Sequence, residues 1–479
     1  MKIARLFAGL LLLAPFAMAD GLPELGDASQ VALPPQEESR IGEEVMRDIR
    51  ASGEMVDDVE VIDYLQALGY RLAANGPDNR QHFGFFAIQD NSINAFALPG
   101  GFIGVHTGLI LTAENESELA SVLGHEIGHV VQHHMARMIA QQSRDMVPSL
   151  AALAIAILAA RSNPQMGQAG IVAAQAGGIQ RQLDFTRENE READRIGLQV
   201  LDQAGFDTRA MPAFFEQMMK GTRFIEGSAP SFLRTHPLTT ERIADVRNRV
   251  EQLPVRQVPD SLEFQLVRAK LRASHGDARQ TVAEMQESLR DKRYINEVAQ
   301  RYGLAVALTR AHEYSKARTE VDWLRSNTPR HPMIDTLAAN LAVAIDQPQQ
   351  AVKLFRQGLT LFPDHRGLIY GCAELLLSMG RADEALNLAL EKSLMFPDDA
   401  YLYELQARAY TMQGKQLLRH QAQGEAYYRL YDLGSAVEQM ELAKKSNDGD
   451  FYQQSIVEAR LNSFRQQLGD PKKKQLGGR

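Results

Sequence analysis

A spacing of 34 residues recurs through the second half of the chain. It separates the members of two series, Pro329, Pro363 and Pro397, and Ala317, Ala351 and Ala385, with Ala283 one interval earlier. A unit of this length holds two antiparallel helices, because a small residue in the second helix lets its partner approach and a later proline ends that helix. The second half is therefore predicted to be a stack of helix pairs.

These units resemble tetratricopeptide repeats. Gly380 and Gly414 fit the glycine of that family, whereas Asp346 departs from it. After Gly414 the period degrades, and a further helix pair around Ala426 and Ala436 is expected to complete the stack. Such a solenoid presents a concave surface suited to docking or substrate capture, and a purely stabilising appendage is the alternative.

The N-terminus has the pattern of a targeting segment. Lys2 and Arg5 precede the apolar stretch Leu6–Phe16, which ends in small residues up to Ala19. This pattern predicts a removable signal peptide, cleaved after Ala19, and therefore export. A membrane anchor is the alternative, but the apolar run is shorter than the roughly 20 residues that span a bilayer.

Composition narrows the classes of function. The 479 residues are 44% hydrophobic and 23% charged, and a chain of this length is expected to form two or more domains. The net charge of -8 comes without a long run of either sign, so nucleic acid is not an expected partner. Cys372 is the single cysteine, which excludes an intramolecular disulfide and favours a place in a helix interface.

Periodicity in the first half predicts helices with a little sheet. Helices are expected over 37–51, 57–74, 115–142 and 188–203. Short strands joined by a tight turn are expected over 82–89 and 95–106, with the break at Pro99, Gly100 and Gly101. Residues 146–180 are rich in small apolar residues and fit either a mobile flap facing membrane or substrate, or a buried alanine-rich hairpin.

The strongest chemical signal is HEIGH, His125 to His129, within the helix predicted over 115–142. Two histidines four residues apart project from one face, so both can bind one zinc ion at about 2.0 to 2.1 Å. Glu126 would face the open coordination position and take a proton from water there. Because this string also occurs on helices whose histidines are simply solvated, its surroundings matter.

A second helix supplies acidic residues. ENEREAD, Glu188 to Asp194, offers Glu190 as the third zinc ligand and leaves the fourth position for water. HEIGH followed by EREADRIG resembles the HtpX-related gluzincin metallopeptidases, in which the first glutamate of an ExxxD pattern binds zinc. The resemblance implies that Asp194 supports a zinc-binding histidine without binding the zinc itself. The alternative is an ordinary charged residue on the helix surface.

Two more segments resemble this family. One is NAFALPGGFIGVHTGLI, before the active-site helix, and the other is THPLTTERI, which contains His236. His236 is interpreted as stabilising the oxyanion, or as occupying the open zinc position and keeping the enzyme inactive until its loop moves. A plain helix-start histidine before Pro237 is a third interpretation.

The expected fold class is α+β and mostly helical, a gluzincin-type peptidase domain with a small sheet followed by an all-α solenoid. The expected segments are a signal peptide over 1–19, a linker over 20–36, a zinc metallopeptidase domain over 37–258, a repeat domain over 259–468 and a disordered tail over 469–479. Leader, peptidase and repeats together resemble periplasmic proteases of this family along the whole mature chain.

The resemblance implies a periplasmic metalloendopeptidase, with one Zn2+ per chain, that degrades misfolded or stalled outer-membrane proteins. It also implies that the repeats contact the outer-membrane assembly machinery, and chaperone activity and peripheral membrane contact are further expectations. The strand near Phe102–Val105 is expected to pair with an extended substrate. The alternative function is a chaperone or assembly adaptor whose zinc site is mainly structural.

Overall fold

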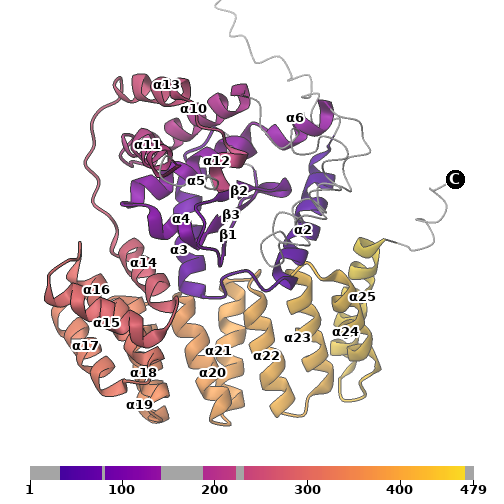
Figure 1. Ribbon diagram of the computed structural model, residues 1–479. Helices are drawn as coiled ribbons and strands as arrows, with labels where there is room; N and C mark the ends of the chain where they lie inside the picture. Colours follow the sequence, from indigo (N-terminus) through magenta and orange to yellow (C-terminus); the bar gives the residue numbers. More distant parts are fainter. Residues whose placement is uncertain (1–32, 78–80, 142–186, 223–230, 470–479) are drawn as a thin grey trace, which may run out of the picture.

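The computed structural model describes residues 33–77, 81–141, 187–222 and 231–469 (Figure 1). Within them the chain is mostly helical with a three-stranded sheet, which confirms the expected fold class. The predicted signal peptide over 1–19, the segment 146–180 and residues 470–479 of the predicted tail lie outside the described residues. None of the helices within the described ranges is long and apolar enough to cross a membrane.

The first half holds the sheet and the helices around it. Its helices are α2 (Pro35–Ala51), α3 (Val59–Ala73), α4 (Thr107–Thr112), α5 (Glu116–Val131), α6 (His134–Gln141), α10 (Arg187–Gln203), α11 (Ala210–Thr222), α12 (Ser231–Thr235) and α13 (Thr240–Val250). Its strands are β1 (Gly84–Ile88), β2 (Ala95–Ala97) and β3 (Phe102–His106), with the 3-10 turn η1 (Pro99–Gly101) before β3. The helices predicted over 37–51, 57–74 and 188–203 are α2, α3 and α10.

β3 is the central strand of the sheet, whose order is β1-β3-β2. It pairs in parallel with β1 and antiparallel with β2. The prediction that an extended substrate pairs with Phe102–Val105 is therefore wrong, because neighbouring strands already occupy the backbone groups on both sides of β3. Within the described ranges β2 pairs with a strand on one side alone, so its other edge is the place for such pairing.

The long helix predicted over 115–142 is two helices, α5 and α6. Its start follows the prediction, since the Asn115 side chain caps α5 by accepting a hydrogen bond from the Glu118 backbone N–H at 3.0 Å. The helix then stops at Val131, and His133 takes a left-handed backbone with φ of 50°. No glycine or proline marks this break in the sequence, so the apolar periodicity predicted one continuous helix.

The second half is the solenoid. Its helices are α14 (Leu262–Ser274), α15 (Ala278–Arg290), α16 (Glu297–Arg310), α17 (Tyr314–Asn327), α18 (Pro332–Ala344), α19 (Pro348–Leu361), α20 (Arg366–Ser378), α21 (Ala382–Met395), α22 (Ala400–Met412), α23 (Gln416–Arg429), α24 (Leu433–Lys445) and α25 (Phe451–Leu468). Consecutive helices pack against each other, and Cys372 is buried within this stack as expected.

The 34-residue period appears in the backbone as well as in the sequence. A left-handed residue ends the first helix of four successive units, at His312, Asp346, Gly380 and Gly414. Asp346 therefore departs from the repeat family in residue type but keeps the backbone conformation, which aspartate tolerates better than most residues.

The alanine series is correct for three of its four members. Ala317, Ala351 and Ala385 are each the fourth residue of their helix and are buried between helices. Ala283 is exposed, so its inclusion was wrong. The fourth residue of α15 is Thr281, which is buried, because this unit is offset by two residues from the 34-residue spacing.

The solenoid curves along one side of the first half (Figure 1), and α3 contacts both α14 and α20. Charged pairs cross this junction: Lys270 Nζ lies 2.7 Å from Glu60 Oε2, and the Arg366 guanidinium pairs with Asp63. The proposed domain boundary at residue 258 lies in the extended stretch between α13 and α14. α3 therefore joins the repeats to the body that contains the HEIGH helix.

Candidate metal centre

Helix α5 carries the two histidines of HEIGH into the protein interior. His125 and His129 are 0% and 3% exposed. Their Nε2 atoms lie 3.1 Å apart. The expected convergence of the two imidazoles is therefore present in the fold.

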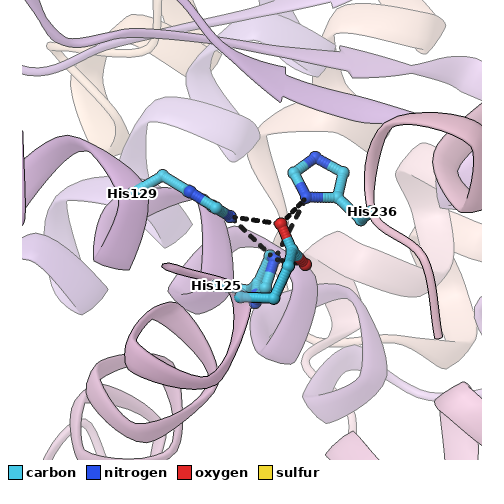
Figure 2. A group of neighbouring side chains, drawn as sticks. His125, His129 and His236 are labelled. Atoms are coloured by element: carbon cyan, nitrogen blue, oxygen red, sulfur yellow. Dashed lines mark hydrogen bonds and ion pairs between the residues drawn. The ribbon is translucent and has the colours of Figure 1, made fainter. Parts of the chain in front are cut away.

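Helix α10 and the residue after α12 complete the cluster. Glu190 Oε2 lies 3.5 Å from His125 Nε2, and Glu190 Oε1 lies 3.4 Å from His129 Nε2. His236 Nδ1 is 3.0 Å from Glu190 Oε1 and 3.4 Å from His125 Nε2. Figure 2 shows the three imidazoles converging on this carboxylate, and one donor atom from each of the four side chains falls within 4.8 Å of the others.

These distances fit one zinc ion. Ligands that bind tetrahedral zinc at about 2.0 to 2.1 Å are separated from each other by roughly 3.3 to 3.4 Å. The observed separations of 3.0 to 3.5 Å are close to the edges of that tetrahedron. Two imidazole nitrogens and a carboxylate oxygen are also donors that zinc prefers.

Asp194 sets the direction of His125. Its Oδ1 lies 2.9 Å from His125 Nδ1, and a carboxylate this close favours a proton on that nitrogen. The lone pair of His125 is then left on Nε2, which faces the other ligands. The structure therefore places Asp194 where the sequence interpretation required it.

Arg242 is part of this arrangement, although it was not predicted from the sequence. From α13 its Nε and Nη2 donate to the two oxygens of Asp194 at 2.8 and 2.7 Å, and its Nη1 lies 2.6 Å from Glu190 Oε2. The side chain is buried with 1% exposure. Arg242 thus orients both acidic residues of α10 and balances part of their charge.

The comparisons with known proteins follow the division of the chain. Residues 62–250 match the model of peptidase family M48, and residues 342–409 match a tetratricopeptide repeat model. The beta-barrel assembly-enhancing protease of Escherichia coli is 31% identical over 449 residues, which cover 94% of this chain and 92% of that protein. The chain belongs to peptidase family M48.

Other M48 relatives match shorter stretches. The putative beta-barrel assembly-enhancing protease of Vibrio cholerae is 37% identical over 321 residues, 66% of either chain. The mitochondrial metalloendopeptidase OMA1 of Schizosaccharomyces pombe is 37% identical over 171 residues, 36% of this chain and 47% of that one. Family membership and the buried cluster together make this chain a zinc metallopeptidase that carries tetratricopeptide repeats.

Helices α5 and α10 cross at glycine residues. A Cβ on Gly197 would lie 2.9 Å from the His125 backbone nitrogen, and one on Gly128 would lie 2.8 Å from the Ala193 carbonyl oxygen. The backbones are therefore as close as glycine allows. This close approach brings Glu190 and Asp194 within reach of the histidines.

Glu126 lies beside this cluster but outside the set of four donor groups. It is fully buried, and its Oε1 lies 3.5 Å from His236 Nε2. Burial raises its pKa above the ordinary carboxyl value, while the His236 and His125 imidazoles and the nearby Ala97 backbone N–H oppose that rise. A buried carboxylate held this close to the candidate zinc ligands suits a group that must exchange a proton.

The charges around the zinc ligands favour a cation. Burial works against a charged His125, yet the carboxylates of Asp194 and Glu190 outweigh it and raise the pKa of this imidazole. Burial lowers the pKa of His129. Burial also disfavours a charged Glu190, but His236 and the other histidines hold the pKa of this carboxyl well below its ordinary value. The acidic residues beside these imidazoles therefore favour a bound cation such as zinc.

His134 also contacts the cluster and was not singled out from the sequence. Its Nδ1 lies 2.8 Å from His129 Nδ1, and its Nε2 lies 3.1 Å from Glu192 Oε2. The prediction of one continuous helix over 115–142 concealed both of these His134 contacts. The signal in the sequence that could have indicated it is a further histidine five residues after His129.

Proposed function

We propose that this M48 peptidase is a periplasmic metalloendopeptidase that degrades misfolded or stalled outer-membrane proteins. One Zn2+ per chain is held by His125, His129 and Glu190. The observation that carries the proposal is the buried convergence of these three side chains, with the buried Glu126 carboxylate beside them, 3.5 Å from His236 Nε2. Three protein ligands with a fourth position available is the arrangement of catalytic zinc.

Each residue then has a defined task. When bound, zinc would act as a Lewis acid on the peptide carbonyl and on water. Glu126 removes a proton from the attacking water and passes it to the departing amine, so one carboxylate serves as base and then as acid. Asp194, fixed by Arg242, keeps His125 in the tautomer that binds metal. No covalent intermediate with the protein is required.

The outer edge of β2 is the place for the substrate backbone. The Asn94 carbonyl and the Leu98 N–H bond the neighbouring strand β3, so the backbone groups of Ala95 and Ala97 point away from it. α5 packs against β2, and the Ala97 N–H lies near Glu126. An extended peptide added to this edge would have its backbone beside the zinc site, and main-chain pairing accepts many sequences.

The site of action rests on two supports. The leader pattern over 1–19 argues for export. The similarity to the Escherichia coli beta-barrel assembly-enhancing protease extends through the repeats and not only through the peptidase region. The repeats are therefore proposed to dock onto the outer-membrane assembly machinery, while the peptidase cleaves outer-membrane proteins that fail to fold.

His236 supports a second candidate, a chaperone or assembly adaptor with a mainly structural zinc. With His236 Nδ1 within 3.4 Å of His125 Nε2 and 3.0 Å of Glu190 Oε1, four protein donors surround one point. A closed set of four protein ligands is typical of structural zinc. The same geometry fits a resting peptidase in which His236 occupies the position needed for water.

The experiment presents one outer-membrane protein, folded in detergent or unfolded from urea, to the purified mature chain. Cleavage of the unfolded form alone, abolished by a chelator and restored by zinc, is the expected result. Preferential cleavage of the folded form would refute the proposed substrate class. Client protection that survives Glu126→Gln but is lost on mutation of the repeats would favour the adaptor.

A further inference from the structure

His134 stands outside the proposed ligand set, yet it is 0% exposed and lies directly behind a ligand. Its Nδ1 is 2.8 Å from His129 Nδ1, on the side of the His129 ring that faces away from the zinc position. His125 has Asp194 at its corresponding nitrogen. The two zinc-binding histidines therefore have different partners behind them, a carboxylate for one and an imidazole for the other.

This contact depends on the break between α5 and α6. Residues five apart on one continuous helix point roughly 140° away from each other around the axis, at about 100° per residue. The left-handed backbone of His133 interrupts the helix and brings His134, the first residue of α6, back against His129. The break thus creates the pairing of the two imidazoles.

The positions of the protons on His134 and His129 follow from the contact of His134 with Glu192. Glu192 on α10 can only accept a hydrogen bond when ionised, and its Oε2 lies 3.1 Å from His134 Nε2 and 2.9 Å from Arg137 Nη1. His134 therefore carries its proton on Nε2 and presents a lone pair at Nδ1. His129 donates from Nδ1 to that lone pair, which leaves the His129 Nε2 lone pair facing Glu190 and His125.

We propose that His134, held by Glu192, is a positioning residue that fixes His129 in the tautomer and ring orientation that bind zinc. The inference rests on the proposed ligation of zinc by His129. It adds a second support to the site: α10 reaches His125 through Asp194 and reaches His129 through Glu192 and His134. Loss of such a partner typically weakens metal binding by about 10- to 100-fold.

Zinc affinity of the full mature chain, measured by competition with a chromophoric chelator, tests this role without using catalysis. His134→Leu removes the acceptor at similar volume, whereas His134→Asn places an amide oxygen near the position of Nδ1. We expect His134→Leu to bind zinc about 10- to 100-fold more weakly and His134→Asn to recover most of that loss. Equal weakening in both variants, or wild-type affinity in His134→Leu, would overturn the proposal.

Glu192→Ala provides an independent test should His134→Leu fail to fold, since Glu192 is one-third exposed and tolerates truncation. Glu188→Ala is its matched control, an exposed glutamate on the same helix. Weaker zinc binding in Glu192→Ala alone supports the proposal, and equal affinity in both variants contradicts it. Absence of zinc binding in the wild-type chain would instead refute the proposed function.

Discussion

Replacing Gly197 with alanine tests the helix crossing that brings Glu190 and Asp194 to the histidines of α5. The added Cβ would lie 2.9 Å from the His125 backbone nitrogen and 3.0 Å from both the Gly124 carbonyl carbon and the His125 Cα. All three neighbours are backbone atoms, so no side chain can rotate away. The helices must move apart, and with them the ligands.

The magnitude follows from two opposing effects. Alanine in place of glycine inside a helix gains about 1 kcal/mol of helix propensity. Overpacking of a tight interface costs about 1 to 3 kcal/mol, and contacts this short to backbone belong at the upper end. The net effect is a destabilisation of about 1 to 2 kcal/mol, which corresponds to zinc binding weaker by about 5- to 30-fold if the cost falls on the metal-bound state.

Chelator competition for zinc, together with far-UV circular dichroism of the apo chain, measures this effect. Gly434→Ala on α24 is the control, because the nearest atom to its new Cβ would be Asp432 Oδ1 at 3.7 Å and its backbone is not left-handed. That variant should keep wild-type zinc affinity and be neutral or slightly more stable. Unchanged zinc affinity in Gly197→Ala would refute the account of the crossing.

Three further predictions concern other parts of the molecule. Arg242→Leu leaves two buried carboxylates without their partner and should cost about 3 to 5 kcal/mol, read from urea denaturation of the peptidase region, whereas a loss below about 1 kcal/mol would contradict the role of this arginine. His236→Ala should raise proteolysis if this histidine blocks the zinc and lower it if it stabilises the oxyanion; no change with zinc retained would argue against both. Burial raises the pKa of the Cys372 thiol from 9.0 to about 11, so the folded state keeps the proton and the solenoid should lose stability as pH rises through that window. Ellman's reagent should label Cys372 at pH 8 only after unfolding, and fast labelling of the folded chain would show that the thiol is accessible.

Local features were predicted well from the sequence because they depend on residues close together in the chain. HEIGH spans only five consecutive residues of one helix, and the repeat is a periodicity of one helix pair. The start predicted at residue 115 agrees with α5, which is capped by Asn115 and has acidic residues in its first turn. These signals can be recognised from neighbouring residues alone, without knowledge of tertiary contacts.

The missed features depend on approaches between distant elements. Arg242 follows His236 in the sequence like an ordinary helix-surface arginine, and only the packing of α13 on α10 buries it against Asp194. The break at His133 has no glycine or proline to announce it, and without the break His134 cannot be recognised as a partner of His129. Strand order was equally hidden, because neither periodicity nor composition says which of three short strands lies in the middle.

Zinc content and cleavage of an unfolded outer-membrane protein, compared between the mature wild-type chain and Glu126→Gln, test the central claim most directly. Because Glu126 is not among the four donor groups, the account predicts one zinc per chain in both proteins and cleavage by the wild type alone. Equal cleavage by the two proteins would contradict the role of Glu126 and point to a contaminating protease. Absence of zinc from the wild type would contradict the metal centre itself.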